Sequence, residues 1–145
     1  MIRWLLAVLL LLASASLLQA ADKPPMGKWF EGVWLREDGL EVRFHPDRVE
    51  FSKGDQRLIW NKEHCDIGAL ERYEFGRATI KRSDIQDAGI PLAREGWKLA
   101  EKIQAFRSDC EESAIFWLAT QDGKLVYLSL YEGMYDAFVY TRPKP

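Results

Sequence analysis

Apolar and polar side chains alternate along several short runs in the first half of the chain. The apolar residues recur at every second position, which is the spacing of a strand with one buried face. These runs are 40–44, 49–52, 56–60 and 72–75. Turn-forming pairs punctuate the chain, and Asp38-Gly39 and Asp122-Gly123 suit two-residue hairpin turns because both central positions of such turns need positive φ.

The strands near the C-terminus are apolar on both faces. Leu125 and Tyr127 share one face of their run, while Val126 and Leu128 share the other. A strand that is apolar on both faces is covered on both faces, so we expect a second layer on the outer side, most simply a helix of the same chain. The runs with this pattern are 115–120, 124–131 and 135–141.

The segment 92–108 is the candidate for that covering layer. Leu99 and Ile103 have helical spacing, but they also fit the alternation of a strand. We therefore expect a short helix or an irregular segment over 91–102, followed by an extended stretch toward Cys110.

These elements predict a mainly β fold of eight or nine short antiparallel strands. Such a set forms a barrel or a flattened sandwich, here with one short helix. The chain shows no internal repeat and no low-complexity run, so we expect one β domain over residues 27–145.

Residues 1–20 have the pattern of a secretory signal peptide. Arg3 gives a positive start, an apolar run follows, and Ala20 is a small residue suited to cleavage. The uninterrupted apolar run is shorter than the roughly 20 residues of a membrane-spanning helix, and an uncleaved anchor is the alternative. We expect a periplasmic product of about 125 residues after cleavage, with residues 21–26 as a tether.

Cys65 and Cys110 are the two cysteines of the chain. Export to an oxidising compartment favours a disulfide between them. A bridge across about 45 residues stabilises the fold by roughly 4 kcal/mol in the chain-entropy model. Two free thiols, or a metal site that also uses His64 and His45, are the alternatives, although no C-x-x-C spacing supports the metal.

Gly32-Val33-Trp34 followed by Asp38-Gly39 stands at one end of the predicted domain, and Tyr140-Thr141-Arg142 stands at the other. With these motifs, both ends resemble small lipocalin-like barrels of the calycin type. The pair Gly27 and Trp29 offers a second possible start. The resemblance implies that Trp34 closes the floor of a barrel, that Arg142 packs over it, and that both residues are structural.

Net charge and motifs exclude several function classes. A formal net charge of −2 gives no reason to expect a nucleic-acid partner. The sequence has no H-E-x-x-H, no G-x-S-x-G and no glycine-rich phosphate loop. His45 and His64, the two histidines, fit ordinary surface positions better than a catalytic base. We therefore expect a binding protein that is not an enzyme and has no cofactor.

Carboxylates leave two minor alternatives open. A glycosidase-like pair of acids is compatible with the many Asp and Glu residues of the chain. Asp84 and Asp87 in the predicted loop 83–89 suggest a calcium site, but no full series of ligands surrounds them.

The segment 131–136 is the main candidate for partner binding. It joins the last two predicted strands and places two tyrosines, a methionine and two acids around a glycine. Tyr and Met are enriched at protein interfaces, although the tyrosines of an ordinary hairpin can also cover a barrel mouth. The charged stretch 68–89 is a weaker candidate. The residues of the main candidate are Tyr131, Glu132, Gly133, Met134, Tyr135 and Asp136.

A small, exported, β-rich chain without catalytic motifs suggests an inhibitor or an immunity protein. Its partner would be another exported protein, such as a cell-wall hydrolase or a type VI secretion effector. A lipocalin-like carrier of a small apolar ligand is the first alternative and needs an unfilled interior. A hydrolase that uses a carboxylate pair is the second.

Overall fold

The computed structural model describes residues 30–65 and 74–145. The predicted signal peptide 1–20, the tether 21–26 and the first residues of the predicted domain lie outside the described residues. So do residues 68–73 of the weaker candidate stretch.

The described residues form one antiparallel sheet of nine strands in the order β4-β3-β2-β1-β9-β8-β7-β6-β5. The prediction of a mainly β fold with eight or nine antiparallel strands is therefore confirmed. The two ends of the sheet, β4 and β5, do not pair with each other, so the barrel is not closed. The strands are β1 (Val33–Arg36), β2 (Glu41–Phe44), β3 (Val49–Lys53), β4 (Gln56–Trp60), β5 (Phe75–Lys81), β6 (Lys102–Ser108), β7 (Ala114–Ala119), β8 (Leu125–Tyr131) and β9 (Met134–Thr141).

The Asp-Gly turns differ from the two-residue turns predicted for them. Arg36 N donates to Leu40 O, and Thr120 N donates to Lys124 O, so each connection has three residues between the bonded pair. Only the glycines, Gly39 and Gly123, have positive φ. Three-residue hairpins of this kind end in a single residue with left-handed φ and ψ. The aspartate before this residue therefore does not need positive φ.

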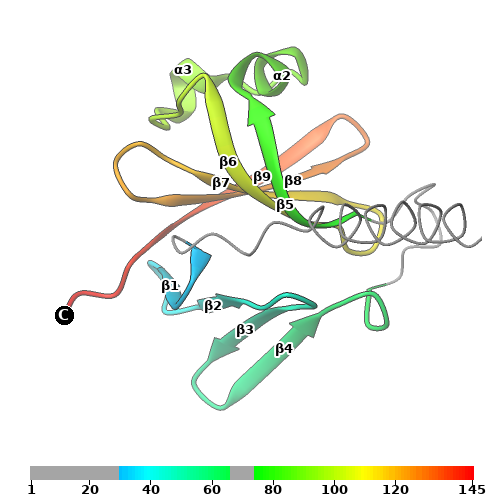
Figure 1. Ribbon diagram of the computed structural model, residues 1–145, viewed down its shortest axis with the longest axis vertical. Coiled ribbons are helices and arrows are strands. Elements are labelled where there is room, and N and C mark those ends of the chain that lie inside the picture. Colours follow the sequence, from blue (N-terminus) through cyan, green and yellow to red (C-terminus); the bar gives the residue numbers. More distant parts are fainter. Residues whose placement is uncertain (1–29, 66–73) are drawn as a thin grey trace, which may run out of the picture.

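A strongly bent sheet places β1–β4 below the layer that β5–β9 form (Figure 1). The concave faces of the two parts meet in an aromatic core. The Trp117 ring lies 5.0 Å from that of Phe44 in the lower part and 4.9 Å from that of Tyr127 in its own part, measured between ring centroids. Phe30 and Phe106 fill the space beside it. The alternation of apolar residues in the sequence therefore identified the inward faces correctly.

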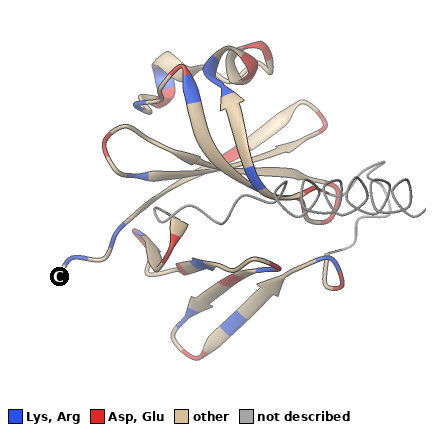
Figure 2. Cartoon of the chain, in the orientation of Figure 1, with Lys and Arg blue, Asp and Glu red and all other residues tan. Residues whose placement is uncertain are grey.

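The convex face of β6–β9 carries a second apolar core, as the double-faced pattern of these strands predicted. Val126 and Leu128 pack here with Ile85 and Leu99. Two short helices of the same chain, α2 (Arg82–Asp87) and α3 (Leu92–Glu95), lie on this side (Figure 1). Figure 2 shows charged residues on both helices and at many turns.

The helix count corrects one part of the prediction, which had a single short helix and a loop over 83–89. The segment forms α2 because Ile85 can insert its side chain into the outer core, which anchors one turn of helix. Of the candidate 92–108, only α3 is helical, and Lys102–Ser108 is strand β6, as the extended stretch toward Cys110 predicted.

A disulfide joins Cys65, just after β4, to Cys110, in the turn between β6 and β7. The predicted pairing is confirmed. It links the lower part of the sheet to the upper part on the side where hydrogen bonding between strands does not close the barrel.

The buried carboxylate of Asp109 organises the same turn. Its Oδ1 accepts hydrogen bonds from Arg107 Nε at 2.9 Å and Ile115 N at 3.3 Å, and its Oδ2 accepts one from Glu74 N at 3.2 Å. Asp109 N donates to Glu74 O at 3.1 Å. This residue therefore connects the start of β5, the end of β6 and the start of β7.

We expect the double substitution Cys65→Ser/Cys110→Ser to lower the free energy of unfolding by up to about 4 kcal/mol, because the unfolded chain regains the freedom of a long loop. Urea denaturation of the oxidised protein and of the variant measures the difference. Equal midpoints for the two proteins would contradict the stabilising role.

Substituting Asp109→Asn should destabilise the fold by about 2 kcal/mol, because the amide group turns a donor toward a backbone N–H and removes the charge beside Arg107. Urea denaturation also measures this change. Asp47→Asn is the control, since Asp47 is exposed and pairs only with its neighbour Arg48. Similar losses in the free energy of unfolding for the two variants would contradict a stabilising role of the hydrogen bonds at Asp109.

Candidate functional site

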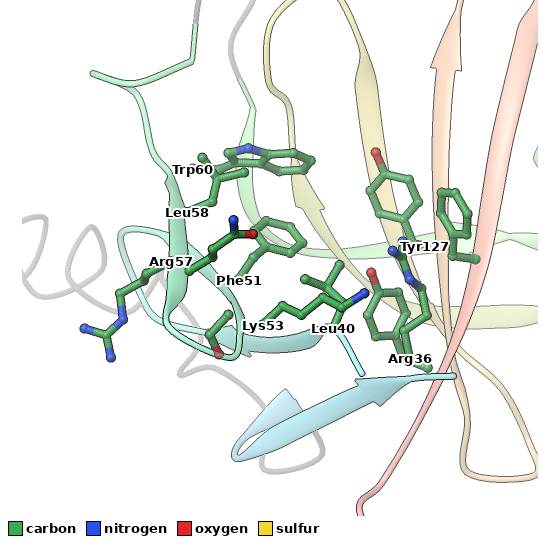
Figure 3. Close-up of a pocket in the computed structure, with 12 residues that line it drawn as sticks. Arg36, Leu40, Phe51, Lys53, Arg57, Leu58, Trp60 and Tyr127 are labelled. Carbon is green, nitrogen blue, oxygen red and sulfur yellow. The ribbon is translucent and has the colours of Figure 1, made fainter. Parts of the chain in front are cut away.

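A cleft of about 620 Å³ opens on the concave side of the sheet, between the β3–β4 hairpin and strands β8 and β9. Figure 3 shows Phe51 and Trp60 on one side and Tyr127 on the other. The cleft is lined by Arg36, Leu40, Phe51, Ser52, Lys53, Gln56, Arg57, Leu58, Trp60, Tyr127, Phe138 and Tyr140.

Aromatic contacts hold the walls of this cleft in place. Phe51 and Trp60 lie 4.5 Å apart between centroids, and Tyr127 and Phe138 lie 5.8 Å apart. Trp117 contacts both Phe51 and Tyr127 from the packed core. The core thus continues into the cleft, and each of these rings packs against at least one other ring.

Two apolar side chains at the cleft remain in contact with solvent. Leu58 is 53% exposed and Phe138 is 43% exposed. Both are among the few large apolar residues that the described part of the chain leaves exposed, and they extend from opposite walls. An exposed apolar surface over a hollow of this size is typical of binding sites.

The polar part of the cleft is cationic. Among the described residues that line it, none is acidic, whereas Arg36, Lys53 and Arg57 are basic. Arg57 binds Glu50 at 3.0 Å on the convex side, and its side chain points away from the cleft (Figure 3).

Asp38 fixes the other two cations from the β1–β2 turn. Both of its oxygens accept hydrogen bonds from Arg36 at 2.7 Å, and Lys53 Nζ lies 3.4 Å away. The Arg36 guanidinium holds the pKa of this carboxyl well below its usual range. The same guanidinium lies over the Phe138 ring at 4.6 Å, a cation–π contact that positions this exposed ring.

Burial raises the pKa of the deepest tyrosine of the cleft. Tyr140 is 1% exposed, and desolvation raises its pKa to about 12. Desolvation also raises the pKa of Tyr127. An ordinary tyrosine, with a pKa of about 10, is already neutral at physiological pH, so these shifts matter only at high pH.

The main candidate segment predicted from the sequence forms the β8–β9 hairpin, outside this cleft. Tyr131 pairs with Met134, and Glu132 and Gly133 form the turn, both with positive φ. Met134 is 64% exposed at the tip, and Asp136 is exposed. The role of this hairpin in partner binding stays a prediction.

Tyr135 has a structural position instead. Its side chain packs on the outer core, its hydroxyl donates to the Glu95 carboxylate, and Arg94 Nη2 donates to it at 3.1 Å. This residue attaches α3 to the sheet, so its presence in the hairpin has an explanation that requires no partner.

The weaker candidates are dispersed in space. Arg77 and Lys81 lie on the edge strand β5, whereas Asp84 and Asp87 lie on α2. Across residues 30–65 and 74–145, no group of three or more His, Cys, Asp or Glu side chains is placed to hold a metal ion. His45 Nε2 lies 3.3 Å from Glu50, and His64 Nδ1 lies 2.6 Å from Asn61 Oδ1.

The contact implied for the end of the chain is present. The Arg142 guanidinium lies 3.9 Å from the centroid of the Trp34 ring, and its Nη1 donates to the carbonyls of Glu31 and Val33. This contact lies at the end of β9 opposite to the β8–β9 hairpin and adds no binding group to the cleft.

The sequence pattern places Leu58 and Trp60 on the apolar face of their run, and Tyr127 and Phe138 on runs that are apolar on both faces, but it does not mark these residues as a site. The missing signal was the open sheet: β4 and β5 do not pair, which leaves some inward positions without an opposing neighbour.

The raised pKa of Tyr140 predicts a loss of stability at high pH. Since the fold favours the neutral phenol, this stabilisation is complete below the ordinary tyrosine pKa of about 10 and disappears as the pH rises through about 12. Denaturation with urea at pH 9 to 11.5 should show a falling free energy of unfolding, and Tyr140→Phe should reduce the slope. An unchanged slope in the variant would contradict the assignment.

Comparison of the chain with family models, with curated proteins and with solved structures found no match.

Proposed function

We propose that this protein is an exported, non-catalytic protein-binding module that acts as an inhibitor or immunity protein against another exported protein. A secreted or cell-wall hydrolase, such as a type VI effector, is the partner class that we propose. The observation that carries the binding role is the cleft, because it leaves Leu58 and Phe138 exposed above a rigid aromatic floor.

Export is supported by the sequence pattern of residues 1–20 and is compatible with the disulfide. We propose the periplasm as the compartment. In the described part of the chain, no helix is long and apolar enough to cross a membrane.

The shape of the cleft favours a protein over a small molecule. Pockets for small ligands bury most of the ligand surface, which requires walls on nearly all sides. Here two wall residues are themselves about half exposed, so the hollow is wide at its mouth. A shallow apolar surface of this kind suits the side chains of a partner protein, whose remaining surface covers the rim.

A lipocalin-like carrier of a small apolar ligand is the second candidate. The volume of about 620 Å³ favours it, since it lies within the usual range of about 300–1,000 Å³ for ligand sites. On this hypothesis, an apolar fluorescent probe binds the cleft saturably and quenches the fluorescence of Trp60. Leu58→Ser then lowers the affinity for the probe.

Photo-crosslinking in cells tests the protein-binding function. A photoreactive amino acid at position 58 reports on the cleft, and one at position 134 reports on the β8–β9 hairpin. We expect one discrete crosslinked protein from position 58 in the periplasmic fraction, because Leu58 is the most exposed apolar residue at the cleft.

The substitutions Leu58→Ser and Glu132→Ala/Met134→Ala make a matched pair, since both change exposed residues. The first should lower partner recovery at least about tenfold, as expected when a central apolar contact is lost. The second tests the predicted hairpin site. Absence of crosslinks from both positions would contradict the protein-binding function. Crosslinks from position 134 alone would assign the binding site to the hairpin in place of the cleft.

A further inference from the structure

Strand β4 presents an open edge beside the cleft. It pairs with β3 from Val49↔Trp60 to Lys53↔Gln56, and within residues 30–65 and 74–145 no other strand pairs with it. In an antiparallel ladder, alternate residues direct their N–H and C=O groups away from the partner strand. These groups are a template for one further strand.

The other edge of the sheet is protected in a way that β4 is not. The inward face of β5 carries Arg77 and Lys81, and Lys81 lies opposite another cation, Lys102. Charges on the inward face of an edge strand oppose the addition of another strand. The inward positions of β4 are Gln56, Leu58 and Trp60, which are all uncharged.

The edge and the cleft belong to one surface. All three inward residues of β4 line the cleft (Figure 3). Because side chains alternate across a strand, a strand added to β4 would direct every second side chain over the cleft, next to Leu58. Apolar or aromatic side chains fit there, against Phe51 and Phe138.

The charges near this edge favour acidic side chains at the outward positions of the added strand. Arg57 lies on the convex face of β4, where its side chain is 69% exposed. Acidic side chains on the outward positions of an added strand would meet Arg57 across the pair. Glu50, the carboxylate that pairs with Arg57, is only 13% exposed and so repels these acidic side chains weakly.

We propose that β4 and the cleft together bind an extended segment of an exported partner by strand addition. The segment pairs its main chain with β4, places apolar or aromatic side chains in the cleft, and presents acidic side chains to Arg57 on the convex face. This inference rests on the proposed protein-binding function and names the site and the chemistry of its partner.

A display library of random seven-residue segments, selected against the disulfide-bonded protein, tests the proposal. We expect enrichment of segments in which acidic and apolar residues alternate. Hydrogen exchange of the complex with one synthetic enriched peptide should show new protection of alternate amides in β4, and none in β5. Every second N–H group of the bound peptide points toward β4, and N-methylation of these amides should abolish binding.

Leu58→Lys and Thr79→Lys form the matched variants. Each adds a cation at an exposed inward position of an edge strand, the first on β4 and the second on β5. Leu58→Lys should lower the affinity for the enriched peptide at least about tenfold, equivalent to about 1.4 kcal/mol. Thr79→Lys should leave this affinity unchanged. Circular dichroism shows that both variants are folded.

Three outcomes would overturn strand addition: no enriched segment, equal affinity for Leu58→Lys, or no new protection in β4. If these occur while position 58 or 134 still crosslinks a partner in cells, the protein-binding function stands and only the strand-addition mode fails. Peptide binding at β4 without a crosslinked partner in cells would instead contradict the function.

Discussion

The packing of aromatic side chains around Trp117 is the contact on which the rest of the structure depends. The sheet is not closed by hydrogen bonds between β4 and β5, so side chains hold its two parts together beyond the short β1–β9 pairing and the disulfide. Trp117 contacts Phe44 and Phe51 from the lower part and Tyr127 and Tyr140 from the upper part. Its Nε1 donates to Ser108 Oγ at 2.8 Å, which satisfies the buried polar atom of the ring.

This mode of closure also explains the cleft. In a closed barrel, each inward side chain has neighbours all around, and a small barrel is filled. Here the packed core ends at Phe51 and Tyr127, and beyond them the two parts of the sheet diverge. The disulfide at Cys65 joins the chain after β4 to the upper part, which fixes this divergence and the position of the β4 edge.

The two faces of the C-terminal strands differ in how they are covered. The convex face of β8 and β9 is covered by α2 and α3, and Tyr135 belongs to that layer. The concave face changes along β9 from the buried Tyr140 to the exposed Phe138 and Met134. The same strand therefore serves the core at one end and offers apolar surface at the other.

The sequence by itself determined most of the secondary structure, since period-two alternation depends only on which side of a strand is buried. It assigned the inward face of β4 and the need for an outer layer over the C-terminal strands from local alternation, and the disulfide from two cysteines behind a predicted export signal. It predicted one helix where the described residues form two, since α2 depends on a single buried side chain, Ile85, and Lys81, at its N-cap position, makes no side-chain capping bond.

Only the tertiary structure decided which inward residues are core and which line the cleft. Trp117 and Trp60 are both tryptophans on inward faces, but Trp117 is fully buried on an interior strand, whereas Trp60 lies on an edge strand. That difference comes from the strand order and from the failure of β4 and β5 to meet. It is a property of long-range pairing, which local sequence patterns do not encode.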